Sequence, residues 1–384
     1  MITKLGIAGT GFIGSGIARL IHNHHSDLEV SSVLTRRSLD DVKSFPVAKA
    51  LTRSLDQFIE GSDLVIECSG DPVHATDVVD AAMRAGKPVV TMNSEFQVTT
   101  GSYFVDRGYL TEAEGDQPGC LAALREDMLM MGFKPLVYGN MKGFMNHNPT
   151  PEDMLYWSSR QGIAPSQTTS FTDGTKMQIE QVLIGNAAGA TIAQQGLIGV
   201  KSDDLNVAAN ELCKVAEDLE FPIVDYTLSS KLAPGVFICA THDSCEAQAL
   251  KYYKLGEGPY YTLLRPYHLC AFETIKTIRR AIQGGGVLLN NSNKPTLSVA
   301  AIAKRKLSKD ELIDAPTGGF MVRGEAVEVS KANDHVPIGI LKGARLLTDI
   351  EPGQYLTWSD VELVDSLAVT IAKTIFCSHK NIAA

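Results

Sequence analysis

Two groups of residues in this 384-residue sequence have the types and the spacing that chemistry requires. Gly9, Gly11 and Gly14 form a glycine pattern close to the N-terminus, and Lys176 ends the string FTDGTK. A glycine-rich turn that opens a helix can seat a phosphate on backbone N–H groups. A lysine beside acidic groups can donate a proton or stabilise a developing negative charge. Together these groups indicate dinucleotide binding and hydride transfer.

The glycine pattern lies between an apolar run and a helical repeat, which makes it more specific than the pattern alone. Residues 4–8 are typical of a strand, and apolar residues recur at helical spacing after the last glycine. Gly9 permits a tight turn, Gly11 lets the backbone approach a pyrophosphate, and Gly14 allows close helix–strand packing. A generic strand-to-helix turn is the alternative. The residues expected to contact the cofactor here are Gly9, Thr10, Gly11, Phe12, Ile13 and Gly14.

The end of the second strand of such a unit selects between NAD and NADP. The predicted strand at 28–34 ends in Thr35, Arg36 and Arg37, and no acidic residue stands there to bind a ribose 2′-hydroxyl. Two guanidinium groups suit a phosphate dianion. We therefore expect NADPH as the cofactor, with NADP preferred over NAD and with Arg36 and Arg37 at the 2′-phosphate. A solvated loop is the alternative.

Polar residues also close the third and fourth predicted strands, at 63–68 and 88–92. In open parallel sheets the ligand crevice lies outside the carboxyl ends of the strands. Ser69, Gly70 and Asn93 are therefore expected on the nicotinamide side of the cofactor. Helix capping or turn formation is the alternative role for Asn93.

Hydride transfer to a carbonyl group requires a proton donor to the developing alkoxide. Lys176 is the best candidate, because its string predicts a turn followed by a helix start. Asp173 and Glu180 flank it, and Glu180 shares its helical face. Asp116 and Glu95 add carboxylates from the cofactor side, so a divalent cation such as Mg²⁺ is a candidate cofactor whose ligands are unknown. A solvated surface lysine in an ordinary helix pair is the alternative.

Arg265 and His268 lie close together in the string RPYH. Arginine suits a phosphate or a carboxylate, and histidine can transfer a proton near neutral pH. We expect Arg265, with Glu95 and Gln117, to bind the substrate. A structural core histidine is the alternative for His268. The predicted catalytic residues are Lys176, Asp173, Glu180, Asp116 and His268.

The predicted elements must bring these residues together. Strands alternate with helices over residues 1–95, which indicates a parallel sheet with right-handed crossovers. We predict an α/β fold with a Rossmann doubly wound parallel sheet in residues 1–148. An α+β substrate, catalytic and dimerisation domain is expected in residues 149–314, and a small β-rich module in residues 315–384. The basic run at 304–306 is expected on the surface.

The N-terminal 95 residues resemble those of homoserine dehydrogenases. Over residues 67–270 the resemblance is to a subgroup of homoserine-dehydrogenase-like proteins that carry a C-terminal SAF (antifreeze-like) module. The matching strings are MNSE at 92–95, GDQPG at 115–119, FTDGTK at 171–176, LGEGPYY at 255–261 and RPYHL at 265–269. Residues 337–363 resemble the SAF module. This subgroup includes 1-deoxy-D-xylulose 5-phosphate reductoisomerase-like enzymes, so the resemblance implies an NADPH-dependent enzyme that isomerises and reduces a small phosphorylated ketose.

The composition limits the partners of the chain. Its 35 basic and 44 acidic residues give a net charge of −9, so no sequence-wide basic surface for nucleic acid is expected. Seven cysteines without a CxxC pair disfavour a disulfide framework or a zinc site and fit a reducing cytoplasm. No apolar run is long enough to span a membrane. We expect a cytoplasmic homo-oligomer, a dimer or a tetramer, that binds a small-molecule substrate.

Three functions follow from these observations. The first is an NADPH-dependent oxidoreductase that reduces, with or without isomerisation, a small phosphorylated polyhydroxy carbonyl compound. The second is a homoserine-type dehydrogenase of a small amino-acid or sugar-acid alcohol. The third is a dinucleotide-binding sensor without turnover, because a fold does not fix a function.

Overall fold

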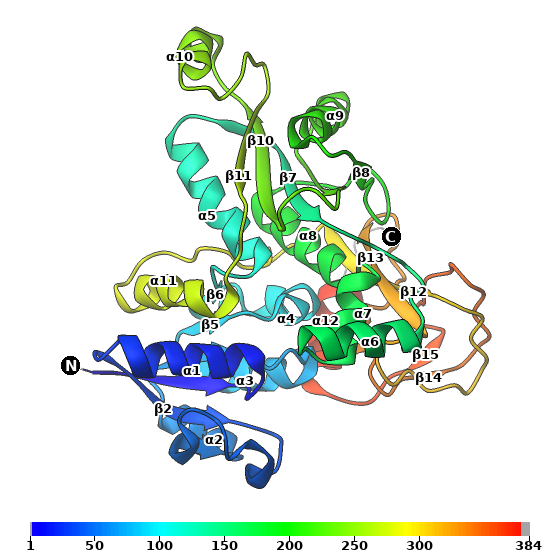
Figure 1. Cartoon of the computed structure of the whole chain (residues 1–384). Helices are drawn as coiled ribbons and strands as arrows, with labels where there is room; N and C mark the ends of the chain where they lie inside the picture. The colour runs from blue at the N-terminus through cyan, green and yellow to red at the C-terminus, as the bar shows by residue number, and fades with distance from the viewer. Residues whose placement is uncertain (1, 378–384) are drawn as a thin grey trace.

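The computed structural model describes residues 2–377, and it begins with a six-stranded parallel sheet in the order β3-β2-β1-β4-β5-β6 (Figure 1). This strand order defines the dinucleotide-binding Rossmann fold, so the predicted fold class is confirmed. The strands are β1 (Thr3–Ala8), β2 (Leu28–Leu34), β3 (Leu51–Thr52), β4 (Leu64–Glu67), β5 (Val89–Thr91) and β6 (Leu110–Glu112). The helices are α1 (Phe12–His24), α2 (Leu55–Glu60), α3 (Pro72–Arg84) and α4 (Ser94–Thr99), with the 3₁₀ turns η1 (Leu39–Val42), η2 (Ala48–Ala50) and η3 (Gly101–Phe104).

Two helices from distant parts of the sequence share the core on one face of this sheet. Ile17 and Ile21 of α1 are 1% exposed and belong to the same apolar cluster as Ala271 and Ile278 of α11. Figure 1 shows α11 beside α1. The chain therefore returns to the Rossmann domain after the second sheet, and the segment just before α11 is held close to the cofactor side.

A second, mixed sheet has the order β11-β10-β7-β9-β8, in which β7 runs parallel to β9 and antiparallel to β10. Neighbouring residues along β7 point to opposite faces, as the alternation of a strand requires. Tyr138 packs in the cluster of α5 and α8, whereas Val137 packs in the cluster of α9. The strands are β7 (Lys134–Lys142), β8 (Val200–Lys201), β9 (Ile223–Leu228), β10 (Gly235–Thr241) and β11 (Tyr261–Arg265). The helices and the 3₁₀ turn are α5 (Gln117–Met130), α6 (Pro151–Gln161), α7 (Pro165–Thr172), α8 (Thr175–Ala188), α9 (Leu205–Asp218), η4 (Ser244–Glu246), α10 (Ala247–Tyr252) and α11 (Cys270–Ile282).

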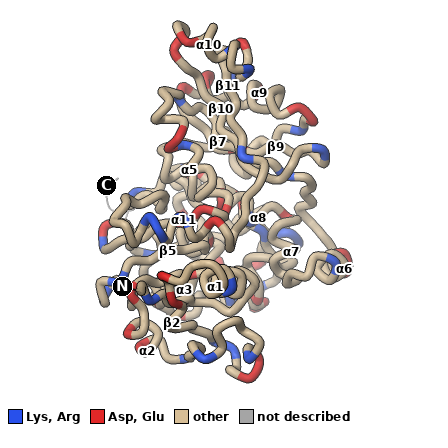
Figure 2. Tube along the Cα trace, turned by 60° about the vertical axis from the view of Figure 1, so that its left-hand side comes forward, with Lys and Arg blue, Asp and Glu red and all other residues tan. Residues whose placement is uncertain are grey.

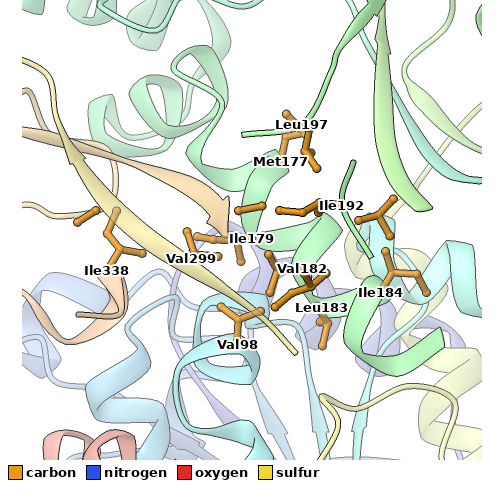
Figure 3. Packing of buried hydrophobic residues seen from close by; sticks show 14 of the residues in the cluster. Val98, Met177, Ile179, Val182, Leu183, Ile184, Ile192, Leu197, Val299 and Ile338 are labelled. Atoms are coloured by element: carbon orange, nitrogen blue, oxygen red, sulfur yellow. The ribbon is translucent and has the colours of Figure 1, made fainter. Parts of the chain in front are cut away.

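Helix α8 is buried on nearly all sides, which fixes the position of its first turn. Met177, Ile179 and Val182 are at most 1% exposed, and they pack against Val98 of α4 and Val299 of β12. Figure 3 shows these side chains around the helix. The polar residues Gln178, Glu180 and Gln181 of this helix are buried as well, so both its apolar and its polar faces are covered. Lys176 therefore extends from a rigid support.

The C-terminal part adds two short antiparallel pairs and a final helix. β12 pairs with β13 across the predicted boundary at 315, just as β7 already belongs to the second sheet before residue 148. Ile371 of α12 is 3% exposed and packs in the cluster that contains Val78 of α3, so this part contacts the Rossmann domain. The elements are β12 (Leu297–Ala303), β13 (Val322–Glu328), η5 (Ile338–Ile340), β14 (Arg345–Leu346), β15 (Val361–Glu362) and α12 (Leu367–Cys377).

Across the described range 2–377, no helix combines the length and the apolar character that a bilayer crossing needs. Cys68, Cys120, Cys213, Cys239, Cys245 and Cys270 are free thiols. Figure 2 shows acidic and basic positions interspersed along the chain, with acidic positions gathered near the centre, between α11 and α8.

Candidate active site

A cavity of about 1080 Å³ runs along the carboxyl ends of the Rossmann strands. The turn after β1, the end of β2 and the loop after β4 form one side of it, and α7 forms another. Two residues of the C-terminal part, Thr317 and Lys342, complete the wall. The ligand crevice of an open parallel sheet is expected at this edge.

The glycine turn has the space and the free donors that a pyrophosphate requires. Gly9 has a φ of +127°, which favours glycine, and a Cβ on Gly14 would lie 2.1 Å from the carbonyl oxygen of Gly9. A Cβ on Gly11 would meet no atom within 4 Å, so the space in front of it is open. Gly11 caps α1 without a side-chain hydrogen bond, which leaves the first N–H groups of the helix for a ligand. Thr10, Phe12 and Ile13 also line the cavity, so the turn fits a dinucleotide.

The end of β2 carries the residues predicted to select the cofactor. Thr35 and Thr10 share a hydrogen bond of 3.0 Å between their hydroxyl oxygens. Arg36 and Arg37 line the cavity, and the Arg36 guanidinium donates to the Asp71 carboxylate at 2.7 Å. Among the described residues, no acidic side chain lines this end of the cavity.

Ser69 and Gly70 line the cavity as expected, whereas Asn93 does not. Asn93 is fully buried, and its Oδ1 accepts from the backbone N–H of Phe96 at 3.0 Å, which caps α4. Its Nδ2 has no hydrogen-bond partner. The position of Asn93 matches the capping alternative, and a role in cofactor binding stays a prediction.

Lys176 lines the cavity at the end where the nicotinamide ring is expected, which is called the reacting end below. Its Nζ donates to Ser94 Oγ at 3.0 Å, to Glu95 Oε2 at 3.2 Å and to Asp116 Oδ2 at 3.3 Å. Ser94 Oγ in turn donates to Asp116 Oδ2 at 2.8 Å. Lys176, Glu95 and Asp116 all line the cavity. The structure thus brings together three residues that lie far apart in the sequence.

Three helix starts position this group. Ser94 and Glu95 open α4, Asp116 caps α5 by accepting from the backbone N–H of Gln117 at 3.1 Å, and Lys176 lies in the first turn of α8. Gly174, with a φ of +88°, makes the sharp entry into α8. The positive ends of α4 and α5 favour the two carboxylates. For Asp116 this adds to the Lys176 ammonium and the hydrogen bond from Ser94, which lower the pKa of its carboxyl group despite burial.

Electrostatics keep the ammonium charged. Burial opposes the charge of Lys176, but Asp116 and Glu95 outweigh it and raise the pKa of Lys176 well above its ordinary value. Burial likewise would raise the pKa of Asp116, yet Lys176 and the hydrogen bond from Ser94 lower that pKa overall. The pair is therefore an ammonium beside a carboxylate at neutral pH.

A second polar cluster adjoins the first, and two of its members were missed by sequence reasoning. Asn140 Nδ2 donates to Gln117 Oε1 at 2.6 Å and to Glu180 Oε2 at 3.1 Å. Lys142 Nζ donates to Gln117 Oε1 at 3.1 Å and lies 3.6 Å from Glu180 Oε2. Burial raises the pKa of Glu180 to about 7. The polar Asn140 within the apolar strand β7 was the available signal for this cluster.

His268 borders the second cluster. Its Nε2 lies 3.4 Å from Gln117 Nε2, and its Nδ1 lies 3.4 Å from the carbonyl oxygen of Gly115. Burial lowers the pKa of His268, so the ring is neutral at neutral pH. His268 therefore lies beside the predicted substrate residue Gln117.

Asp173 lies away from these clusters. Its carboxylate accepts from Lys304 Nζ at 2.5 Å and from the backbone N–H of Thr175 at 2.9 Å, and it does not line the cavity. The side chains of Asp173 and Lys304 are 0% and 4% exposed, so the surface position expected for Lys304 was wrong. Asp173, buried just before α8, pairs with the Lys304 ammonium, and the sequence did not indicate this partner. Asp173 thus anchors the helix that carries Lys176.

Arg265 also has partners inside the protein. Its guanidinium donates to Glu114 Oε2 at 3.1 and 3.2 Å and also to Glu273. Lys276 Nζ binds the same Glu114 oxygen at 3.0 Å. Arg265 is 13% exposed in its side chain and does not line the cavity. The guanidinium of Arg265 is thus already paired with two carboxylates and does not face the cavity, so its role in binding the substrate stays a prediction.

The carboxylates do not form a cage for a divalent cation. Within residues 2–377, no group of three or more histidine, cysteine, aspartate and glutamate side chains could hold a metal ion. Glu95 and Asp116 both accept from the Lys176 ammonium, which stands where a cation between them would be placed. The residues present thus do not fit Mg²⁺ at this position.

Two family models match separate segments of the chain. Residues 9–103 match the model "Homoserine dehydrogenase, NAD binding domain", and residues 115–274 match the model "Oxidoreductase DRL, catalytic domain". The first segment is thus similar to an NAD-binding domain and the second to an oxidoreductase catalytic domain.

Particular relatives match over shorter stretches. An inositol 2-dehydrogenase of Cereibacter sphaeroides is 34% identical over 119 residues, which are 30% of this chain and 34% of that protein. The corresponding protein of a second strain is 37% identical over 91 residues, 23% of this chain and 27% of that protein. The chain thus matches about a third or less of the length of these relatives.

Among solved structures, scyllo-inositol dehydrogenase from Lactobacillus casei, with bound NAD(H) and scyllo-inositol, is 12% identical with a TM-score of 0.41. That comparison covers 76% of this chain and 92% of the other. UDP-N-acetylglucosamine 3-dehydrogenase from Acidithiobacillus ferrooxidans is 11% identical, with a TM-score of 0.43 and the same coverage of 76% and 92%.

Proposed function

We propose that this protein is an NAD(P)-dependent oxidoreductase that interconverts an alcohol and a carbonyl group on a small polyhydroxy compound. The observation that carries the proposal is the placement of the Lys176 ammonium, held by Ser94, Glu95 and Asp116, at the reacting end of the dinucleotide cavity. The names of the matched models and of the inositol dehydrogenases support it.

The bound nicotinamide cofactor would supply or accept the hydride. Lys176 holds the substrate oxygen as an ammonium and donates a proton to it during reduction. In oxidation Lys176 can accept the alcohol proton only after it has given its own proton to a base, for which Glu180 is the candidate. Glu95 and Asp116 keep the ammonium charged and aimed at the cavity. Glu180, one helical turn beyond Lys176 and with a pKa of about 7, exchanges protons near neutral pH. Lys142 and Asn140 contact Glu180 and orient its carboxyl group, and none of these three residues lines the cavity.

The charges of the two clusters favour an uncharged substrate. Lys176 and Lys142 face Glu95, Asp116 and the titrating Glu180, so no surplus of positive charge is present. Glu112 lies fully buried nearby, and burial raises its pKa well above the ordinary value. Hydroxyl groups suit such a balanced set of donors and acceptors.

A narrower form of the proposal adds the phosphate group, the NADP preference and the isomerisation that the family resemblance implies, and it includes the SAF-like module at 337–363. This form needs a cation for the substrate phosphate. The predicted cation, Arg265, is paired with Glu114 and Glu273. For the substrate and the reaction, the geometry therefore supports the broader form better, and the NADP preference is a separate proposal. The cytoplasmic location and the homo-oligomer stay predictions.

Turnover by the purified full chain tests both forms. Myo-inositol, scyllo-inositol and 1-deoxy-D-xylulose 5-phosphate are each assayed with both nicotinamide cofactors in the appropriate oxidation state. We expect oxidation of an unphosphorylated polyol, and we expect Lys176→Met to lower kcat/KM by about a thousandfold while dinucleotide binding is retained. The control is Lys134→Met, at an exposed lysine paired with Asp243.

Turnover restricted to the phosphorylated ketose would select the narrower form. Dinucleotide binding without turnover on any of these compounds would instead favour the sensor. Full activity of Lys176→Met would remove the proposed proton donor.

A further inference from the structure

The outer rim of the cavity gathers cations from two distant parts of the chain. Arg36 and Arg37 follow β2, and Lys342 follows η5 in the C-terminal part; all three line the cavity. Asp71, at the start of α3, pairs with Arg36 NH1 at 2.7 Å and with Lys342 Nζ at 3.8 Å. The rim is thus a place where the C-terminal part meets the cofactor domain.

The rim has more positive than negative charge. Asp71 caps α3 by accepting from the backbone N–H groups of Val73 and His74, at 3.1 and 3.2 Å, so its position is fixed. Despite partial burial, Arg36 holds the pKa of Asp71 below its ordinary value. Three cations therefore face a single carboxylate, which leaves a surplus of about two positive charges.

The other titratable groups do not cancel this surplus. His74 lines the cavity, but burial lowers its pKa and keeps it neutral near pH 7. Asp40 and Asp41 follow Arg37 along the chain but are exposed and do not line the cavity. Asp40 is paired with Lys43 at 2.8 Å.

A phosphate monoester carries about −1.5 to −2 charges at neutral pH, which matches the surplus at the rim. The adjacent Thr35 cannot bind a ribose 2′-hydroxyl as a carboxylate would. Lys342 is 63% exposed in its side chain and lies at the long distance of 3.8 Å from Asp71, so it can turn to a ligand without breaking a tight pair.

We propose that Lys342, together with Arg36 and Arg37, forms a subsite for the 2′-phosphate of NADP, so that the C-terminal part determines cofactor choice. This inference rests on the proposed function, because it needs a dinucleotide in the cavity. It assigns the C-terminal part a direct contact with the cofactor. An ammonium can bind a phosphate oxygen as a point charge.

Binding to the full chain tests the proposal without any substrate. The dissociation constants of NADPH and NADH are measured for the wild type, for Lys342→Gln and for the control Lys331→Gln. Lys331 is an exposed lysine of the same part of the chain, paired with Glu328. We expect Lys342→Gln to weaken the binding of NADPH by about tenfold and the binding of NADH by less than about twofold. Lys331→Gln should leave both dissociation constants unchanged.

A pair of cofactor fragments isolates the subsite. Adenosine 2′,5′-bisphosphate should lose affinity in Lys342→Gln, whereas adenosine 5′-monophosphate should not. Equal effects on the two fragments, or no effect on either, would overturn the role of Lys342 while leaving the proposed function intact. A wild type that binds neither NADPH nor NADH would overturn both.

Discussion

Two ion-pair groups, one beneath the start of α8 and one at the rim of the cavity, differ in their exposure to water. Asp173 and Lys304, beneath the start of α8, are 0% and 4% exposed, whereas Arg36 and Lys342 at the rim are 54% and 63% exposed. A buried pair is costly to separate, because removing one partner leaves an unpaired charge in the interior. An exposed pair is hydrated and contributes little to stability. A carboxylate paired with a cation thus positions the helix that carries Lys176 in the buried group. In the exposed group, the paired cations can turn to bind a ligand.

The largest expected effect concerns the buried pair. Lys304→Met should lower the free energy of unfolding by about 3–5 kcal/mol, since it leaves the Asp173 carboxylate buried without its partner. Lys342→Met, the matched change at the rim, should alter it by less than about 1 kcal/mol. Urea unfolding of both variants measures the difference.

A double variant sharpens this comparison. Adding Asp173→Asn to Lys304→Met removes the buried charge, so part of the lost stability should return. If the two lysine variants lost equal stability, the distinction between buried and exposed pairs would be contradicted.

The glycine turn offers a second comparison between a buried position, Gly14, and a position that faces the cavity, Gly11. Gly14→Ala should lower the thermal midpoint, because its Cβ would lie 2.1 Å from the carbonyl oxygen of Gly9. Gly11→Ala should leave the midpoint unchanged but weaken dinucleotide binding by at least about tenfold, since the methyl group enters the open space of the pyrophosphate seat. Thermal unfolding and a binding titration on each variant check the pair, and a stable Gly11→Ala with unchanged affinity would place the pyrophosphate elsewhere.

The smallest expected effect is a change in the pH dependence of kcat/KM when the buried carboxyl group of Glu180 is replaced. Glu180, whose pKa is raised to about 7 by burial, is protonated below that pH and ionised above it. Because alcohol oxidation releases a proton, kcat/KM for oxidation should rise with pH through about 7. Glu180→Gln should lose this rise and retain a low, pH-independent rate near pH 7. A pH profile of the variant that still inflects near 7 would assign the titration to another group.

Local patterns predicted much of the cofactor end. The glycine turn follows from short-range conformational rules, and the loop after β4 follows from the rule that parallel strands end at one edge. The same rule placed Glu95 at the edge of the sheet that borders the cavity. These features depend on residues within one strand–helix unit, where spacing carries most of the information.

Contacts between distant segments were not predictable in this way. Lys304 was expected on the surface because it lies in a basic run, yet its partner Asp173 is 131 residues away. Lys142 and Asn140 lie on a strand of the second sheet and were missed, because nothing near them in the sequence points to Glu180. The internal partners of Arg265 likewise come from two other segments, around Glu114 and Glu273.

Helix α12 has a consequence for how the protein is made. Ile371 of this helix is buried in the same apolar cluster as Val78 and Phe96 of the Rossmann domain. During synthesis the ribosome completes all of the second sheet before it reaches Leu367–Cys377. The domain that is translated first therefore keeps part of its apolar surface open until nearly all of the described chain has emerged, so a shortened nascent chain would be a natural client for chaperones.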